Sequence, residues 1–403
     1  MLGRLVDRTW VYDPSLYAPA HYRRACGYQA FLPNPLAELR LDLPGTLAGV
    51  VSDAEEAVRS LNAAPRPALA PLARLLLRTE SIASSKVEGM QVDARTLARA
   101  EAKADTGGKV SSTALEVLAN IDAMILAVEE ATSDEHVQVA RIIDIHKALM
   151  ANAHNSNMAG RIRAEQNWIG GNDYNPCGAD FVPPPHEEVD TLLDDLCAFC
   201  SENELPPLVQ AAVAHAQFET IHPFTNGNGR TGRALVHVLL RRRALSPSYV
   251  PPISVVLARN KERYIEGLTA YRNGNVNTWL EQFAVATAQA AALAEQYLRE
   301  ARSLQDRWRA DLRSRAQPPR SDAAAWAVID QLPGHPIVTV PVLVAATGRS
   351  KPAIGQALDQ LASAGILAAV SGGARNRAWE AVGLLDLLST LDDSCRNPPY
   401  DLR

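Results

Sequence analysis

Residues 222–233 have the sequence His-Pro-Phe-Thr-Asn-Gly-Asn-Gly-Arg-Thr-Gly-Arg, which combines an imidazole, a turn-forming segment and two guanidinium groups. Arg230 and Arg233 are three positions apart, so on a helix both lie near one face of the first turn. Guanidinium groups bind phosphate oxygens in a two-point fashion. A neutral imidazole at His222, close to a bound phosphate, can accept a proton from an incoming hydroxyl. The stretch therefore predicts a phosphate site with its own proton acceptor.

The segment after the turn predicts a helix over residues 230–243, because its apolar residues recur at helical spacing. Free amides at the start of a helix, together with the helix dipole, form an anion site. Gly227 and Gly229 allow unusual backbone angles and a close approach to a ligand, while Asn226 and Asn228 suit the entry turn and the N-cap. Each feature alone would favour a purely structural interpretation, but the ordered run favours a site.

The run resembles the signature of the Fic family, His-Pro-Phe-x-acid-Gly-Asn-Gly-Arg-x-x-Arg. The resemblance implies a protein adenylyltransferase, which transfers AMP from ATP to a side-chain hydroxyl of a protein. It also implies that His222 is the general base, that Arg230 contacts the β-phosphate and that Arg233 orients the γ-phosphate. The nucleotide-binding residues implied within the run are Asn226, Gly227, Asn228, Gly229, Arg230, Thr231, Gly232 and Arg233.

Asn226 is the one fixed position at which the chain departs from the family pattern. The family usually carries Asp or Glu there, and that carboxylate holds the magnesium ion. An amide oxygen is a neutral and weaker ligand for a hard cation. We therefore expect ATP and Mg²⁺ as cofactors, with the metal held mainly by the phosphates and water, and Asn226 as its only protein ligand in the signature.

A second segment, residues 84–89, has the sequence Ser-Ser-Lys-Val-Glu-Gly and resembles the inhibitory motif of Fic proteins, Ser/Thr-x-x-x-Glu-Gly/Asn. In such proteins the Glu pairs with the second Arg of the signature. Here this implies a pair between Glu88 and Arg233, which would remove the γ-phosphate partner and place negative charge in the phosphate site. The structural alternative is that Glu88 is a surface helix residue.

A third segment resembles the Fic flap, a hairpin over the active site. It begins at Gly160–Arg163, continues through Asn167–Gly171 and ends at Phe181–Pro185, where three prolines remove amide donors. Tyr174 to Asp180 would form the tip. An edge of such a hairpin can align the backbone of a target protein by strand addition. The alternative is a plain surface hairpin.

Tyr264 and Tyr271 lie seven positions apart and share one face of the helix predicted to begin near Arg259. The resemblance places this region at the adenine pocket, and aromatic rings stack on bases of any identity. Two tyrosines at the edge of the core are an almost equally good interpretation.

Composition indicates a soluble protein of the cytoplasm. The chain has 403 residues, a formal net charge of −5 and five cysteines, and an odd number of cysteines suggests a reducing compartment. It contains no apolar run long enough for a membrane span, and its N-terminus lacks the apolar core of a secretion signal. The pair Cys197 and Cys200 predicts a packed helix face rather than a zinc site.

Helical periodicity recurs along most of the chain, whereas residues up to about Pro35 appear irregular. Helices are expected at residues 53–61, 68–84, 94–102, 112–131, 137–150, 189–201, 208–220, 230–243, 259–271 and 277–315. We expect four parts: an N-terminal helical segment with the inhibitory motif (1–105), a Fic core (106–290), a helical connector and linker (291–318) and a winged helix (319–403).

The last part predicts two helices with a turn and then a hairpin, preceded by a helix over residues 322–332 and a short extended piece. This is the winged-helix pattern, and it resembles the module that follows the Fic core in many bacterial relatives. Arg349, Lys351 and Arg377 suit contacts with DNA. However, seven basic and eight acidic residues leave residues 319–403 almost neutral, whereas DNA-binding domains usually carry a basic excess.

The sequence thus predicts a mostly α-helical fold, with a helical Fic core, a small β-hairpin flap and a C-terminal winged helix. Its predicted function is a protein adenylyltransferase that acts on Ser, Thr or Tyr hydroxyls, including its own, and is autoinhibited by Glu88. Two alternatives stay open: a transcription regulator that senses nucleotide and binds DNA through the winged helix, and an enzyme that removes AMP at the same site. The target protein is not specified by the sequence, and a homodimer is compatible with it.

Overall fold

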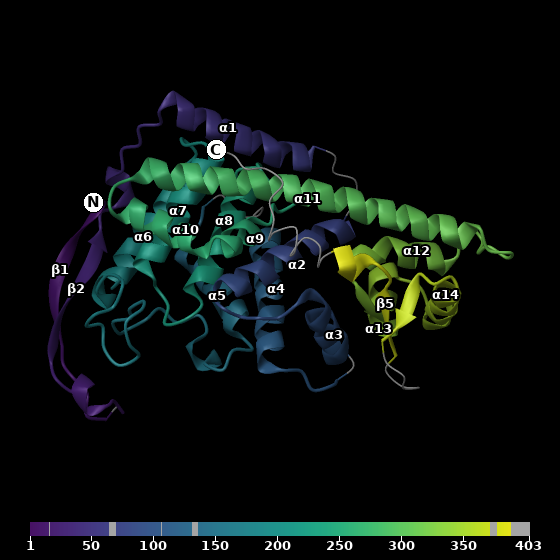
Figure 1. Ribbon diagram of the computed structural model, residues 1–403, viewed down its shortest axis with the longest axis horizontal. Helices are drawn as coiled ribbons and strands as arrows, with labels where there is room; N and C mark the ends of the chain where they lie inside the picture. Colours follow the sequence, from purple (N-terminus) through teal and green to yellow (C-terminus); the bar gives the residue numbers. More distant parts are fainter. Residues whose placement is uncertain (16, 64–69, 106, 131–135, 371–376, 388–403) are drawn as a thin grey trace.

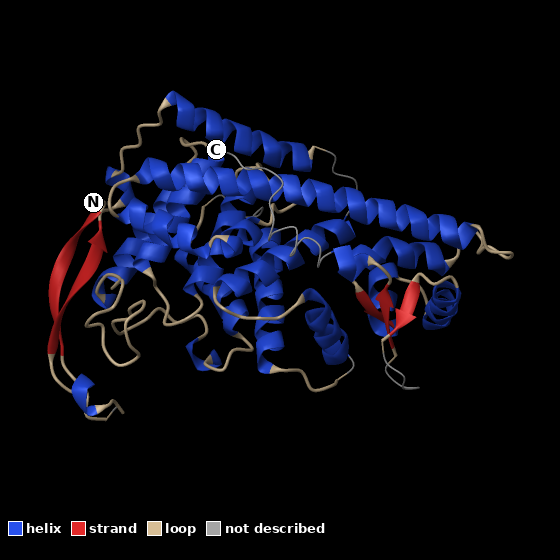
Figure 2. Cartoon of the chain, in the orientation of Figure 1, coloured by secondary structure: helices blue, strands red, loops and turns tan. Residues whose placement is uncertain are grey.

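The computed structural model describes residues 1–15, 17–63, 70–105, 107–130, 136–370 and 377–387. The fold within these ranges is mostly helical, as the sequence predicts, and it includes two small antiparallel sheets (Figure 2). The helices of the main body are α1 (Gly45–Asn62), α2 (Ala70–Val87), α3 (Ala94–Asp105), α4 (Ser112–Glu130), α5 (Val139–Met150), α6 (Val189–Ser201), α7 (Pro207–Ile221), α8 (Asn228–Arg242), α9 (Ile253–Arg259), α10 (Lys261–Arg272) and α11 (Val276–Arg313).

Two long helices lie along one side of the body. α1 packs along α11, which runs without a break past residue 291, where the sequence suggests the start of a connector (Figure 1). Tyr297, Trp308 and Leu312 of α11 are buried, so the second half of this helix belongs to the core. The short helix α9 was not expected from the sequence. It packs against α2 and α11.

α7 and α8 form the centre of the molecule. Residues 208–221 of α7 are all buried, and α8 is buried from Asn228 to Leu240. The two helices pack against each other, and Gly232 allows their close approach: a Cβ at this position would lie 2.7 Å from Glu219 Oε1 and 2.8 Å from Phe218 Cδ1. The pairing joins the end of α7, which carries His222, to the start of α8.

The prediction that the first 35 residues are irregular is wrong. Strands β1 (Gly3–Trp10) and β2 (Cys26–Pro33) form an antiparallel hairpin at one end of the molecule (Figure 1). Pro14 and Pro19 lie in its connecting loop, where they do not interrupt pairing, and Pro33 is the last residue of β2. The prolines therefore lie in the loop and at the end of β2, where they are compatible with a hairpin.

The described part of the C-terminal module contains helices and a three-stranded antiparallel sheet, at the opposite end from the hairpin (Figure 1). Its elements in chain order are α12 (Ala324–Gln331), β3 (Ile337–Thr339), α13 (Val340–Thr347), α14 (Lys351–Ser363), β4 (Leu367–Ala369) and β5 (Ala378–Ala381). β5 is the central strand and pairs with both β3 and β4. Residues 371–376, where the wing was expected, lie outside the described ranges.

This module docks on the two helices that flank Glu88. The 3-10 turn at Leu332–Gly334 packs against α2, and β3 packs against α3. Arg95 of α3 forms ion pairs of 3.0 Å with Glu380 and 2.8 Å with Asp386. The module thus contacts α2 at Pro71, near the start of that helix, and also contacts α3, which follows the Glu88 segment.

The cysteines differ from the expectation of a reducing environment. Cys26 and Cys177 form a disulfide, while Cys197 and Cys200 of α6 are free and buried. The predicted packed helix face at the latter pair is confirmed. Disulfides persist in oxidising surroundings, so the bond runs against the argument that placed the chain in the cytoplasm. None of the helices in the described part of the chain has the length and apolar character that a membrane span requires.

The core along α11 provides a stability test. Ala290 is completely buried, whereas Ala292 on the same helix is exposed. Ala290→Leu should reduce the free energy of unfolding by about 1–3 kcal/mol, because a larger side chain must force its neighbours apart. Ala292→Leu makes the same chemical change at the surface and should alter it by less than about 0.5 kcal/mol. Chemical denaturation of both variants measures the difference, and equal effects would contradict the assigned packing.

Candidate active site

His222 follows the last residue of α7 with a backbone in the left-handed region, at φ 50° and ψ 59°. A non-glycine residue adopts this conformation at some cost and needs support from its surroundings. Its carbonyl oxygen accepts hydrogen bonds from Arg163 Nε at 3.0 Å and Asn167 Nδ2 at 3.1 Å. Its amide donates to the carbonyl of Phe218 at 2.9 Å. These contacts fix the direction in which the imidazole leaves the helix.

The segment expected to begin the flap has a different partner. Ile162 forms a β-bridge with Phe224, and the amide of Arg163 donates to the carbonyl of Pro223 at 2.9 Å. Asn167 Nδ2 also donates to the carbonyl of Phe224 at 3.0 Å. This first part therefore braces the signature loop. Sequence reasoning placed these residues near the site but missed this role. The feature that reveals the bracing role of Arg163 is its burial beside the backbone carbonyls of the signature loop. Burial cannot be read from the sequence.

The surroundings of His222 keep its imidazole neutral. Burial and the positive charge of Arg163 together lower its pKa to about 4, against the opposing effect of the charge of Glu88. The carbonyl of Glu219 also favours the protonated ring. The balance leaves an unprotonated ring nitrogen at neutral pH, which is the state that a proton acceptor needs.

The loop between His222 and α8 is closed by side-chain hydrogen bonds. Asn228 Oδ1 accepts from the amide of Phe224 at 2.9 Å, and its Nδ2 donates to the carbonyl of the same residue at 2.7 Å. Gly227 has φ 78° and precedes the first residue of α8, so the conformational freedom expected of this glycine is used. Thr231 Oγ1 donates to the carbonyl of Gly227 at 2.9 Å and secures the first turn.

His146 of α5 also stabilises the loop between His222 and α8 through hydrogen bonds of its ring. The amide of Gly160 donates to its Nδ1 at 3.0 Å, so Nε2 carries the proton and donates to the carbonyl of Asn226, also at 3.0 Å. Its ring stacks on Phe224 with centroids 3.7 Å apart. Burial lowers the pKa of His146 to about 4, so this arrangement persists at neutral pH.

Asn226 does not assemble a metal site. It is exposed, and its Oδ1 accepts a hydrogen bond from the amide of Gly227 at 2.7 Å. No group of three or more His, Cys, Asp or Glu side chains in the described residues could hold a metal ion. The residues present therefore do not fit a magnesium ion held by the protein alone.

Arg233 is almost fully buried, and its Nε and Nη2 have partners at the end of α2 and in the residue that follows it. Its Nε donates to Ser84 Oγ at 2.9 Å, and its Nη2 donates to the carbonyl of Ser84 at 2.8 Å. Nη2 also contacts Glu88 Oε1 at 2.7 Å. Burial would lower the pKa of Arg233, but the charge of Glu88 outweighs it and raises the pKa. Likewise, burial would raise the pKa of Glu88, but Arg233 and Arg230 hold it below its usual value.

The Glu88 carboxylate lies over the first turn of α8. A Cβ on Gly229 would collide with Glu88 Oε1, so only glycine leaves room for it there. This is the end of α8 at which the dipole and free amides favour negative charge. The side chain of Glu88 is 36% exposed, so the carboxylate enters from the solvent side while Arg233 holds it from within.

Arg230 is buried but poorly satisfied. Its closest hydrogen-bond acceptors are the thioether sulfurs of Met90 at 3.8 Å and Met150 at 4.0 Å, and its Nε has no partner. Only 2% of Arg230 is exposed, and burial lowers its pKa. A buried cation normally pairs with an anion, because desolvation without a partner is costly. Arg230 therefore marks a place where a bound anion would complete the site.

A buried network fixes α2, which carries the inhibitory segment. Glu80 Oε1 lies 3.1 Å from His237 Nε2 of α8, and its Oε2 accepts from the amide of Ser254 of α9 at 2.8 Å. Asn120 Nδ2 of α4 donates to the carbonyl of Ser81 at 2.7 Å. Three helices thus hold α2 in the register that brings Glu88 to Arg233.

The two tyrosines are both buried. Tyr271 is 1% exposed and its hydroxyl donates to Gln217 Oε1 at 3.1 Å. Tyr264 is 7% exposed and its hydroxyl lies 2.9 Å from His215 Nε2. A pocket between α9, α10 and α11 has Asn260, Arg263 and Tyr264 in its lining. Contact with a nucleotide base stays a prediction for both tyrosines.

Sequence reasoning missed Glu219, which lies one turn before His222. It is buried, its Oε1 has no partner, and it lies beside Gly232. Burial raises its pKa to about 7, partly against the charge of Arg233. The site thus contains a second carboxyl group on the inner side of Arg233, opposite Glu88.

The flap itself consists of one antiparallel bridge. The amide of Ile169 donates to the carbonyl of Phe181 at 2.8 Å, and the amide of Phe181 donates back at 3.1 Å. The guanidinium of Arg272 lies over the Phe181 ring, 3.9 Å from its centroid, and joins the flap to α10. The expected tip, Tyr174 to Asp180, is present as a compact loop.

Comparison with known families now explains this arrangement. The family model described as "Fic/DOC family" matches residues 136–240, which contain the signature, and the model described as "Fic/DOC family N-terminal" matches residues 49–129, which contain Glu88. The chain is a member of the Fic family.

Relatives of this Fic protein are named protein adenylyltransferases. A protein adenylyltransferase Fic of Nematostella vectensis is 28% identical over 149 residues, which are 36% of this chain and 31% of that protein. Protein adenylyltransferase fic-1 of Caenorhabditis elegans is 31% identical over 121 residues, which are 30% of this chain and 22% of that protein. The matched regions thus span less than a third of the length of these relatives.

Solved structures share the fold. A Fic family protein from Desulfovibrio desulfuricans G20 has a TM-score of 0.50 at 21% identity, over 85% of this chain and 98% of that one. Fic-1 from C. elegans also has a TM-score of 0.50, at 18% identity, over 64% of this chain and 74% of that one. At this level of identity the likeness concerns the fold of the Fic protein alone.

The electrostatics of His222 can be tested directly. Its imidazole should titrate near pH 4 in the full chain, with His222→Ala used to assign the NMR signal. Glu88→Gln should lower the pKa further, because removing a negative charge destabilises the imidazolium. A pKa near 6.5, or a rise in the variant, would contradict the described surroundings.

Proposed function

We propose that this Fic protein transfers AMP from ATP to a Ser, Thr or Tyr hydroxyl of a protein, its own chain included, and that Glu88 holds it inactive. The observation that carries the proposal is the pair of buried arginines at the start of α8: Arg233 is ion-paired with Glu88, whereas the hydrogen-bond acceptors of Arg230 among the described residues are the thioethers of Met90 and Met150. The names of the relatives point to the same chemistry.

The transfer would proceed in one displacement. The hydroxyl oxygen attacks the α-phosphorus, the bond from that phosphorus to the bridging oxygen breaks, and pyrophosphate leaves. His222 takes the hydroxyl proton on its neutral ring. The amides of residues 227–229 and the guanidinium of Arg230 stabilise the charge that develops on the phosphate oxygens. Arg233 would orient the leaving pyrophosphate when Glu88 does not occupy it.

Autoinhibition would follow from competition for one guanidinium. Glu88 occupies Arg233 and places a negative charge above Gly229, at the end of α8 where phosphate oxygens would lie. Both effects oppose a productive position of the γ-phosphate. The carboxylate is accessible from solvent, so its displacement requires no unfolding of the core. Glu88 could also position a water to remove AMP, and release of AMP from a modified chain by the wild-type protein would reveal this reverse role.

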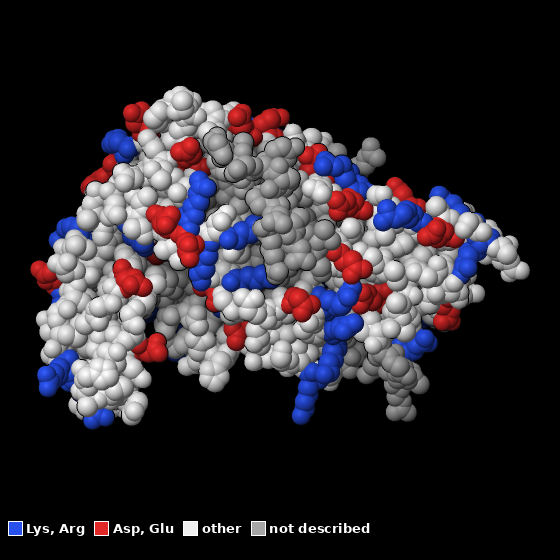
Figure 3. Space-filling view, viewed as in Figure 1, with Lys and Arg blue, Asp and Glu red and all other residues white. Residues whose placement is uncertain are grey.

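We also infer that the described residues within 319–403 form a winged helix, and we keep the four-part division of the chain, in which the connector proposed from residue 291 onward is the buried second half of α11. The support is the element order and the antiparallel sheet β3-β5-β4. On the face shown in Figure 3, basic and acidic side chains are interspersed and form no basic field. Because the module is also nearly neutral, docking to protein is favoured over DNA. A specific gel shift of DNA by the full chain would overturn that preference.

Removal of the inhibitory carboxylate should activate the enzyme. Glu88→Gly should raise self-labelling with ATP radiolabelled on the α-phosphate by on the order of 10²-fold, the effect typical of restoring one electrostatic contact in a transition state. Glu88→Gln keeps the shape but loses the charge, and should give an intermediate rate.

The matched control adds His222→Ala to Glu88→Gly. Loss of a general base should lower the rate by about 10²-fold or more without loss of folding. Absence of labelling in Glu88→Gly would reject AMP transfer, and undiminished labelling in the double variant would reject the role of His222.

Asn226 should limit the use of magnesium. Asn226→Asp, placed in the Glu88→Gly background, should lower the magnesium concentration needed for half-maximal labelling several-fold, because a carboxylate is a charged ligand for a hard cation. Titration of labelling against magnesium chloride measures this. Thr225→Asp adds the same charge one position earlier, on another exposed residue, and should have a smaller effect.

A further inference from the structure

The N-terminal hairpin is an arm that reaches from the main body to the tip of the flap. At its base, the amide of Leu2 donates to the carbonyl of Arg272 at the end of α10, at 2.9 Å. Along its length, the amide of Phe31 donates to the carbonyl of Val182 in the flap, also at 2.9 Å. At its far end, Cys26 is joined to Cys177. Neither the sequence analysis nor the proposed reaction gives this arm a role.

Aromatic contacts align the two partners at the far end. Trp10, which pairs with Cys26 across the hairpin, lies edge-on to Trp168 of the flap with ring centroids 5.5 Å apart. Tyr22, in the loop of the hairpin, stacks on Tyr174 at 5.0 Å. The arm therefore contacts the flap at two places: at Trp168, just before the Ile169–Phe181 bridge, and at Tyr174 in the tip.

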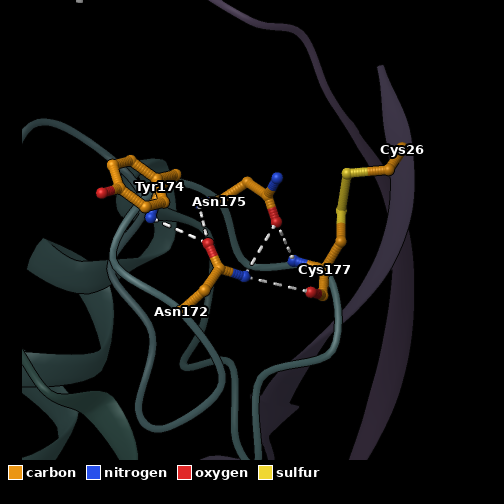
Figure 4. The surroundings of a disulfide bond; sticks show 5 residues. All are labelled: Cys26, Asn172, Tyr174, Asn175 and Cys177. Carbon is orange, nitrogen blue, oxygen red and sulfur yellow. Dashed lines mark hydrogen bonds between the residues drawn. A yellow bond between two sulfur atoms is a disulfide. The ribbon is translucent and has the colours of Figure 1, made fainter. Parts of the chain in front are cut away.

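The tip of the flap is a rigid unit with one covalent attachment (Figure 4). Asn172 Oδ1 accepts from the amides of Tyr174 and Asn175 at 2.8 and 3.0 Å, and Asn175 Oδ1 accepts from the amide of Cys177 at 3.1 Å. Trp168 Nε1 donates to the carbonyl of Asn172 at 2.6 Å and ties the loop to the flap strand. Because these bonds are internal to the flap, the disulfide is the covalent constraint that sets where this unit lies relative to the arm.

The Cys26–Cys177 disulfide is partly exposed, and it does not contact Arg230 or Arg233. Cys26 and Cys177 are both half-buried, unlike the fully enclosed Cys200. Burial raises the pKa of Cys197 to about 12, which keeps that thiol protonated and unreactive. The partners of Arg230 and Arg233 come from α2, α5 and the segment after α2. A movement of the flap tip would therefore affect the part of the site where a protein substrate would dock, and it would leave the partners of Arg230 and Arg233 in place.

The geometry points to a thiol-responsive clamp: the Cys26–Cys177 bond holds the flap tip against the N-terminal hairpin and restricts docking of the protein substrate, and reduction releases the tip without altering the nucleotide site. The direction of the effect on activity rests on the proposed function, in which the flap aligns the acceptor chain. A flap edge that a hairpin already covers is less available for strand addition.

The chemistry is thiol–disulfide exchange with a dithiol. A thiolate of the dithiol attacks one sulfur, the bond between Cys26 and Cys177 breaks, and a mixed disulfide forms. The second thiol of the reagent closes its own disulfide and releases both cysteines as thiols. Two electrons and two protons pass from the dithiol to the protein. A small-molecule disulfide reverses the change.

Hydrogen exchange on the full-length protein tests the clamp without reference to activity. Dithiothreitol should increase the exchange of amides in residues 172–180 several-fold, while the amides of α8 stay unchanged. The double variant Cys26→Ser/Cys177→Ser should exchange quickly with or without the reagent. Cys197→Ser/Cys200→Ser controls for the other described cysteines and should keep the full response. Slow exchange of the tip after reduction, or the absence of the bond from air-oxidised protein, would overturn the proposal.

Measurement of self-labelling shows whether reduction of the disulfide raises or lowers the activity. In the Glu88→Gly background, reduction should raise the rate of self-labelling several-fold with little change in the KM for ATP, and the Cys26→Ser/Cys177→Ser variant should be fast throughout. A lower rate after reduction would overturn the gating direction. No labelling in either redox state would reject AMP transfer, while the exchange experiment would still decide whether the clamp exists.

Discussion

The structure of the site depends on how the buried guanidinium of Arg233 is neutralised. A cation that is 2% exposed requires an anion or hydrogen bonds, and Glu88 supplies the anion while Ser84 accepts hydrogen bonds from Nε and Nη2. Because Ser84 lies at the end of α2 and Glu88 directly after it, this side chain helps to tie α2 to α8. It also sets the state of the site, since the carboxylate that satisfies Arg233 lies where phosphate oxygens would lie.

Arg230 shows the opposite condition within one turn of the same helix. Its hydrogen-bond neighbours Met90 and Met150 carry no charge, and the carboxylates of Glu88 and Glu116 act on it only through space, so no printed hydrogen bond joins Arg230 to an anion in the described residues. In the proposed function the two arginines would divide the roles: Arg233 would maintain the inhibited state, and Arg230 would contact the phosphates. The contrast explains how a nucleotide could bind to this site while its γ-phosphate is held in an unproductive position.

The remainder of the molecule restrains the two chain segments that would have to move. Glu80, His237 and Ser254 hold α2, and the C-terminal module contacts both α2 and α3, on either side of Glu88. The N-terminal hairpin restrains the flap in the same way from the other end of the molecule. Under the two proposals, access of nucleotide and access of protein would be governed by different contacts.

The sequence by itself determined the features that depend on residues close together in the chain. The spacing in residues 222–233 specifies a helix start with an anion site, and apolar periodicity located most of the helices, because both depend on residues within a few turns of one another. The role of Arg163 in bracing His222, the β1–β2 hairpin and the Cys26–Cys177 bond were decided only by tertiary structure. In each case the partners are far apart in the chain, 151 positions for the disulfide, and only the packing of the whole fold brings them together.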